Sequence, residues 1–162
     1  MKMVSNASPL INLARIGQLD LLRKLFGELF IPQAVWDEVV IQGAGQAGAE
    51  EVKSAPWIEK RVVTNITLVQ ALRQELDAGE SEAISLAVEM KTDLLIMDER
   101  LGRDTARQLG LRVIGLIGVL TTAKSRGLIK SIKPHLDALR DVAGFRVDVA
   151  LYARVLKEEG EL

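Results

Sequence analysis

Four short segments of this chain each place an oxygen-bearing side chain next to a predicted strand or helix. Three of them carry a carboxylate, at Glu38 in AVWDE, at Glu80 in LDAGE and at Asp98 in LLIMDE. The fourth segment, MVSNAS, carries an amide at Asn6. Hard cations such as Mg²⁺ take oxygen ligands that converge from several directions, so separate segments can build one site. The pattern indicates a divalent-metal site in which Asn6 contributes a neutral oxygen.

The elements that must position these side chains alternate between strands and helices. MKMVS is predicted to be a strand, and Ser8-Pro9 opens an apolar-periodic helix through Leu13. LLIM at 94–97 is a short apolar run, typical of a strand buried on both faces of a parallel sheet. We therefore expect an α/β fold with three α/β/α layers around a central parallel sheet. Ligands of such sheets lie beyond the carboxyl ends of the strands, where Asn6 and Asp98 are expected.

The remaining elements supply the other acids and a helical tail. A strand is predicted at 29–31, and Pro32 begins the helix that carries Glu38. Gly79 is expected to separate two helical stretches, which leaves Glu80 at the start of the second, where the helix dipole favours an anion. Two tail helices, within about 134–158, are expected to cover a sheet face or a partner subunit.

Length and composition predict one domain over 1–162. The chain is 48% apolar and contains no cysteine, which excludes thiolate nucleophiles, cysteine-ligated metals and disulfides and suits a reducing cytosol. No stretch has membrane-spanning length without charge, so we expect a soluble cytoplasmic protein without membrane contact. The net charge of −1 argues against indiscriminate binding of polyanions.

Positive charge is nevertheless concentrated in one part of the chain. Residues 99–133 hold eight Lys and Arg against two acids. Such a cluster can face phosphates, or it can be the solvated side of two helices, and the sequence leaves both interpretations open. Within it, Arg100 and Arg103 follow Asp98 within one helical turn and are candidates for binding phosphates beside a metal, with ion pairs to Glu99 or Asp104 as the alternative.

Over nearly its whole length the sequence resembles PIN domains, in particular a prokaryotic PIN-like subfamily of poorly defined function. The resemblance rests on VSNASPLINLARIG, IPQAVWDEV, LDAGESEAISLA, MDERLGRDTARQLGL, GLIGVLTTAKSRGLI and LYARVL. It implies a parallel sheet flanked by helices, a Mg²⁺- or Mn²⁺-dependent ribonuclease site and frequent homo-oligomers. For many members it also implies a toxin role beside a small antitoxin protein, with RNA as the substrate.

Carried over by motif, the acidic positions of the family fall at Asn6, Glu38, Glu80 and Asp98, and its hydroxyl position falls at Ser8. Position 6 departs from the pattern, which has aspartate there. An amide oxygen can coordinate a cation but brings no charge and cannot act as a base. The site could therefore be weakened, activated only by bound RNA phosphate, or inactive. Neighbouring acids offer substitutes, namely Asp37, Glu82, Glu99 and Asp104.

Each acid also has an ordinary structural interpretation. Asp98 could cap the next turn, Glu80 could be a favourable first-turn charge, and Glu38 could be an exposed helical acid. GAGQAG at 43–48 matches G-x-G-x-x-G, but 65–69 lacks the acid that a dinucleotide fold needs, so it is interpreted as a flexible loop.

Three functions follow from these residues. The first is a PIN-type endoribonuclease that depends on Mg²⁺ or Mn²⁺, and the second is a degenerate PIN fold that binds RNA or assembles without cutting. The third, phosphoryl transfer through an aspartyl intermediate, is disfavoured because the first strand ends in Asn6-Ala7-Ser8 and offers no nucleophilic aspartate.

Overall fold

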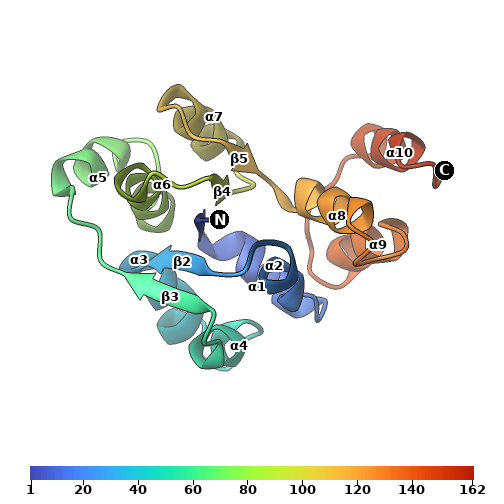
Figure 1. The fold of residues 1–162 in the computed structure, drawn as a ribbon, viewed down its shortest axis with the longest axis horizontal. Coiled ribbons are helices and arrows are strands. Elements are labelled where there is room, and N and C mark those ends of the chain that lie inside the picture. The colour runs from blue at the N-terminus through green and yellow to red at the C-terminus, as the bar shows by residue number, and fades with distance from the viewer.

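The computed structural model describes residues 1–162, which form a five-stranded parallel sheet flanked by helices (Figure 1). The strand order is β3-β2-β1-β4-β5. The strands are β1 (Met3–Ser5), β2 (Leu29–Pro32), β3 (Ile58–Arg61), β4 (Leu94–Ile96) and β5 (Val113–Ile114). The predicted α/β class and parallel sheet are confirmed.

Burial along the strands follows their position in the sheet. Val4 of β1 pairs with Phe30 of β2 and with Leu95 of β4, and all residues of β1 are buried. The edge strand β3 buries only Ile58 and exposes 59–61. A central parallel strand is covered on both faces, and this explains why β1 and β4 are apolar runs.

The helices form a layer on each side of the sheet. They are α1 (Ala7–Arg15), α2 (Asp20–Phe26), α3 (Gln33–Trp36), α4 (Ala49–Ser54), α5 (Ile66–Leu72), α6 (Ala78–Met90), α7 (Arg100–Gln108), α8 (Leu116–Ser125), α9 (Lys133–Asp141) and α10 (Val149–Glu158). Figure 1 shows α5 and α6 on one side and α1 and α2 on the other. The larger apolar cluster holds Leu10, Leu22 and Leu120, and the smaller one holds Ile84 and Leu86. None of these helices has the length and apolar character needed to cross a bilayer.

The helix predicted to begin at Pro32 has a different form. The four residues of α3 lead directly into a π-helical segment, η1 (Asp37–Gln42), that carries Glu38. Val39 and Val40 of this segment are both buried in the core. Gly43 ends the segment, where a Cβ atom would lie 2.5 Å from the Val39 carbonyl oxygen.

The boundary predicted at Gly79 is also wrong, because Gly79 lies inside α6. The helix begins at Ala78 after Asp77, whose carboxylate accepts a hydrogen bond from the Glu80 amide at 2.8 Å. Glu80 accepts in return from the Asp77 amide at 3.2 Å, completing a capping box. Two satisfied amides at the helix start outweigh the low helix propensity of one glycine.

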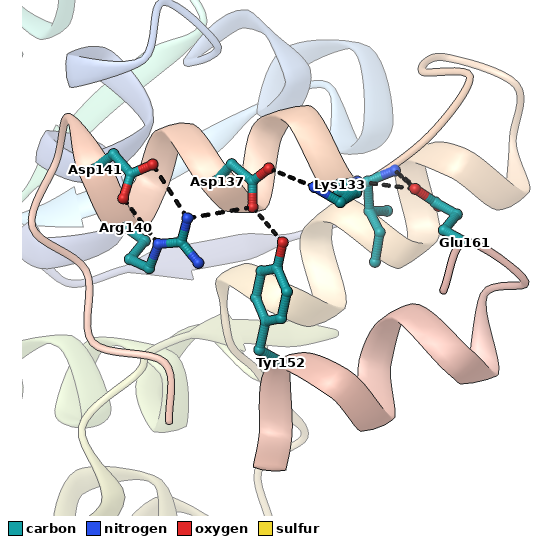
Figure 2. Close-up of polar contacts among 7 residues, drawn as sticks. Lys133, Asp137, Arg140, Asp141, Tyr152 and Glu161 are labelled. Atoms are coloured by element: carbon teal, nitrogen blue, oxygen red, sulfur yellow. Dashed lines mark hydrogen bonds and ion pairs between the residues drawn. The ribbon is translucent and has the colours of Figure 1, made fainter. Parts of the chain in front are cut away.

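The tail helices α9 and α10 add Leu136, Leu139, Val155 and Leu156 to the larger core cluster. The Glu161 carboxylate accepts from the Ile132 and Lys133 amides at 2.9 Å and from Lys124 of α8 at 2.8 Å. Figure 2 shows a second group of contacts, in which Asp137 of α9 receives hydrogen bonds from the Lys133 ammonium and the Tyr152 hydroxyl. Polar contacts thus hold the end of the chain to α8 and to the start of α9, and hold α10 to α9.

Candidate active site

A cavity of about 300 Å³ lies beyond the carboxyl end of β1 and collects side chains from four separate elements. We call it the acidic pocket. Its lining residues are Asn6, Ala7, Ser8, Glu38, Asp77, Gly79, Glu80 and Glu99. Asn6 follows β1, Glu38 lies in η1, Glu80 lies in the first turn of α6, and Glu99 precedes α7. The structure therefore brings Asn6, Ser8, Glu38 and Glu80 of the predicted set to one cavity.

Asn6 is the most enclosed polar residue of this pocket. It is 4% exposed, and its backbone N–H donates a hydrogen bond to the Ile96 carbonyl of β4 at 3.3 Å, which holds the residue against the sheet. Its Oδ1 atom is buried and has no hydrogen-bond partner. A buried oxygen without a partner is costly, so this atom is suited to accept a ligand.

Two of the four carboxylates that line the pocket, those of Glu38 and Glu80, resist ionisation. Burial raises the pKa of Glu38, and the nearby Asp77 charge raises it further. Burial also raises the pKa of Glu80 to about 7, with Asp77 and Glu99 adding repulsion, although the backbone hydrogen bond from Asp77 opposes the shift. Acids that crowd one another in a partly dry pocket are stabilised by a proton or by a cation.

Two glycines leave room for these carboxylates. A Cβ atom at Gly79 would lie 3.1 Å from the Glu38 Oε1 atom. A Cβ atom at Gly102 would lie 3.2 Å from the Glu80 Oε2 atom and 2.5 Å from the Met97 sulfur. Larger residues at 79 and 102 would therefore displace the side chains that form the acidic pocket.

Asp98 does not line the acidic pocket. Its Oδ1 atom accepts a hydrogen bond from the Leu116 amide at 2.9 Å, at the start of α8, and its Oδ2 atom is buried without a partner. Burial raises the pKa of Asp98, while the Leu116 hydrogen bond and the Arg103 charge oppose this effect. Asp98 therefore does act as a cap, but it caps α8 and not the next turn of the chain as predicted, and its Oδ2 atom is left without a partner.

Asp98 lies instead in the wall of an adjoining cavity of about 850 Å³, which we call the basic groove. Three arginines line it, Arg103, Arg146 and Arg154. Ser8 and Glu99 line both cavities, so the acidic pocket and the basic groove share a wall.

The two arginines predicted to bind phosphate are placed differently. Arg103 lines the basic groove, and its Nε atom is buried without a partner. Arg100 is exposed and lines neither cavity, so its predicted place at the site is not supported. Neither arginine forms the alternative ion pair with Glu99 or Asp104, and Asp104 pairs instead with Arg107 at 3.8 Å.

Much of the positive charge in 99–133 serves internal contacts. Lys124 pairs with Glu161, Arg126 donates to the Leu25 carbonyl at 2.7 Å, and Lys133 pairs with Asp137. This part of the chain is therefore not one continuous phosphate-facing surface.

Of the acids proposed as substitutes for position 6, only Glu99 reaches the acidic pocket. Asp37 accepts a hydrogen bond from Gln33, and Glu82 accepts one from the Ala34 amide. Sequence reasoning missed Asp77 as a pocket residue. The D-x-x-E spacing of Asp77 and Glu80, which is typical of a helix start, could have indicated it.

The donor set of the acidic pocket fits a hard divalent cation in its chemistry, since every polar side chain there offers oxygen. No group of three acidic or histidine side chains lies close enough together to hold a metal ion on its own. Mg²⁺ commonly uses one or two protein carboxylates and keeps several water ligands. Glu38, Glu80 and the unpartnered Asn6 oxygen satisfy that smaller requirement.

Comparisons with known proteins agree with this architecture. A family model described as a PIN domain (DUF3368) matches residues 2–161. The structure is similar to a PilT N-terminus domain protein from the hyperthermophilic archaeon Sulfolobus solfataricus P2. The TM-score is 0.53 at 19% sequence identity, over 76% of this chain and 93% of that chain. This likeness concerns the fold alone. No curated protein matches the chain.

Proposed function

This chain belongs to the PIN-domain family DUF3368, and from that premise we propose that it is a divalent-metal-dependent endoribonuclease. The observation that carries the proposal is the acidic pocket, in which a buried unpartnered Asn6 oxygen lies with the carboxylates of Glu38 and Glu80. RNA is the proposed substrate, because the pocket adjoins a groove lined by three arginines.

The proposed roles follow from the chemistry of each side chain. A bound Mg²⁺ or Mn²⁺ would supply Lewis-acid polarisation of a phosphodiester and lower the pKa of water. Glu38 and Glu80 would hold the cation by charge, and Asn6 would orient it through a neutral oxygen. The Ser8 hydroxyl, at the wall between the two cavities, can donate to a phosphate oxygen.

Asp98 and Arg103 line the basic groove, next to the wall that it shares with the acidic pocket. Asp98 holds the start of α8 through the Leu116 amide, and its free oxygen can accept a proton or a hydrogen bond. The Arg103 guanidinium can bind a phosphate oxygen, because charge-assisted pairs of this kind are strong.

The test is cleavage of a labelled single-stranded RNA in saturating Mn²⁺. We expect Glu38→Gln and Glu80→Gln each to reduce the cleavage rate by about a hundredfold or more, since removal of one charged active-site group commonly has that effect. Glu75→Gln is the control, because Glu75 is exposed and outside the pocket. The proposal fails if the wild-type protein and an Asn6→Asp variant are both inactive.

A second candidate function is a degenerate PIN fold that binds RNA or assembles without cutting. Two observations favour it, the amide at Asn6 and the lack of three converging acids. Calorimetry that detects no Mg²⁺ or Mn²⁺ binding, together with salt-sensitive RNA binding, would decide for this candidate.

We further propose that the protein is the toxin of a toxin–antitoxin pair, acts in the cytoplasm and forms homo-oligomers. The support is its family membership together with the motif resemblance. Light scattering on the purified protein tests the oligomeric state. Arrest of bacterial growth on expression, lost in Glu80→Gln, tests the toxin role.

A further inference from the structure

We infer that the basic groove holds the phosphate backbone of single-stranded RNA through Arg146 and Arg154, two residues of the C-terminal tail. The inference rests on the proposed function and extends it to a part of the chain far in sequence from every acid of the pocket. It assigns a substrate-binding role to the segment between α9 and α10 and to α10 itself.

The two guanidinium groups are free to bind an anion. Arg146 is exposed and makes no ion pair and no side-chain hydrogen bond. Arg154 has one weak contact, 4.0 Å from Glu158, in which both side chains are about two-thirds exposed. An exposed pair at that distance contributes little to stability, so folding does not explain why these arginines face the groove. Both are available for bidentate contacts with phosphate.

The groove is also lined by apolar side chains. Ile114, Ile117 and Phe145 line it, and all three are partly buried against the larger core cluster. RNA combines a charged phosphate with a flat base in each repeating unit, so it matches arginines beside an apolar wall. An acidic protein segment would match the arginines but has no equivalent need for the apolar wall.

The groove also adjoins the acidic pocket. Because Ser8 and Glu99 line both cavities, a strand bound to the arginines lies next to the pocket that holds Glu38 and Glu80. The volume of about 850 Å³ is within the range of sites that hold small ligands, so a few nucleotides fit.

Local contacts hold the two arginines in place. Arg15 of α1 donates to the Ala143 carbonyl at 3.0 Å, and the Phe145 amide donates to the Leu139 carbonyl at 2.8 Å. Asp148 caps α10 by accepting from the Leu151 amide at 2.7 Å. Arg146 therefore lies in a turn whose backbone is held by hydrogen bonds, and Arg154 lies on the helix that follows, α10.

The experiment is fluorescence anisotropy with a labelled single-stranded RNA of mixed sequence, in EDTA, over a range of salt concentrations. Without a divalent cation the RNA stays intact, so binding is measured separately from cleavage. The double variant Arg146→Gln/Arg154→Gln is compared with Lys24→Gln/Lys53→Gln, which removes the same charge from exposed positions on α2 and α4. Circular dichroism melting confirms that each variant is folded.

We expect each groove arginine to contribute about tenfold in RNA affinity. The slope of log affinity against log salt should become shallower by about 1.4 in the groove variant, since each lost contact with a single strand removes about 0.7. The control should change neither quantity by a comparable amount.

The inference is overturned if both double variants bind RNA with the same affinity and salt slope. It is also overturned if polyglutamate competes for the groove and loses affinity in the variant while RNA binding is unchanged, because that assigns the groove to an acidic protein. Loss of RNA binding in the groove variant of a protein that never cleaves RNA would support the inference and reject the nuclease proposal.

Discussion

We expect Asn6 to determine how strongly the acidic pocket holds a cation. Its unpartnered Oδ1 atom is in the pocket with two carboxylates that burial keeps from ionising easily. The motif resemblance expects an aspartate at this position, and the amide removes one negative charge. Without a metal, charge repulsion in the pocket should therefore be smaller than with aspartate at position 6. The affinity for a divalent cation should also be lower.

Asn6→Asp tests this role directly. In the absence of metal we expect the variant to lose about 1 to 3 kcal/mol of stability, because it buries another acid beside Glu38 and Glu80. In Mn²⁺ its melting temperature should rise more than that of the wild-type protein, and RNA cleavage should increase by about tenfold or more. Asn65→Asp is the control, since Asn65 caps α5 and aspartate caps equally well. An unchanged Mn²⁺-induced shift in the variant would contradict the assignment.

Glu80 predicts a dependence of stability on pH. Its pKa is raised from 4.5 to about 7 in the folded protein, so between these values the folded state binds a proton that the unfolded state has lost. Stability should therefore fall as pH rises from about 4.5 to about 7. Melting of the metal-free protein across this range measures the effect, and Glu80→Gln, which can still cap α6, should flatten the curve. A wild-type curve that rises with pH in this interval would exclude the raised pKa.

At the scale of elements, α6 and η1 determine the distance between the pocket acids. Glu38 is carried by the π-helical turn, and Glu80 is fixed by the capping box at the start of α6. Gly79 allows the two elements to approach, because it leaves space next to the Glu38 carboxylate.

Gly79→Ala should separate stability from metal binding. In a helix, alanine normally stabilises by about 0.5 to 1 kcal/mol relative to glycine, but here its Cβ would meet Glu38. We expect little net change in stability and a several-fold loss of Mn²⁺ affinity by calorimetry. Ser85→Ala, in the same helix, is the matched control. It removes a buried hydroxyl without a partner and should raise stability by about 1 kcal/mol without changing Mn²⁺ affinity. Equal effects of the two variants on Mn²⁺ binding would refute the role of Gly79.

Much of this arrangement could be predicted from local sequence signals. The apolar runs of β1 and β4 and the Asp148 cap of α10 depend on neighbouring residues only. The π-helical form of η1 could not be predicted, because the apolar positions Val39 and Val40 are also compatible with an ordinary α-helix. Asp98 lies outside the acidic pocket and caps a helix that begins eighteen residues later. The spacing of residues in the sequence cannot indicate such a contact.

At the scale of the whole molecule, the tail completes the lining of the basic groove. Glu161 joins the last residues of the chain to the start of α9 (Figure 2). Its ion pair with Lys124 joins them to α8 as well. Burial raises the pKa of Glu161, but hydrogen bonds from the Ile132 amide and from Lys124 outweigh this and leave it lowered. The sequence predicted the tail helices but not this contact or the groove arginines, because their positions depend on how the tail folds back.

Glu161→Ala should loosen the tail. Three donors lose their acceptor, so we expect a loss of about 1 to 3 kcal/mol and faster hydrogen exchange in α9 and α10. RNA binding should weaken while Mn²⁺ affinity is retained. Glu75→Ala is the control, since Glu75 is exposed and lines neither the acidic pocket nor the basic groove. Unchanged exchange in both helices would show that Glu161 does not hold the tail.

The central claim is that oxygens of Asn6, Glu38 and Glu80 share one pocket and bind a divalent cation. Anomalous diffraction from crystals soaked in Mn²⁺ tests it most directly. The account predicts one strong peak in the acidic pocket within about 2.5 Å of oxygens from Glu38 and Glu80, with Asn6 or a water molecule completing the site. An empty acidic pocket at saturating Mn²⁺, or a peak bound only by residues outside it, would contradict the account.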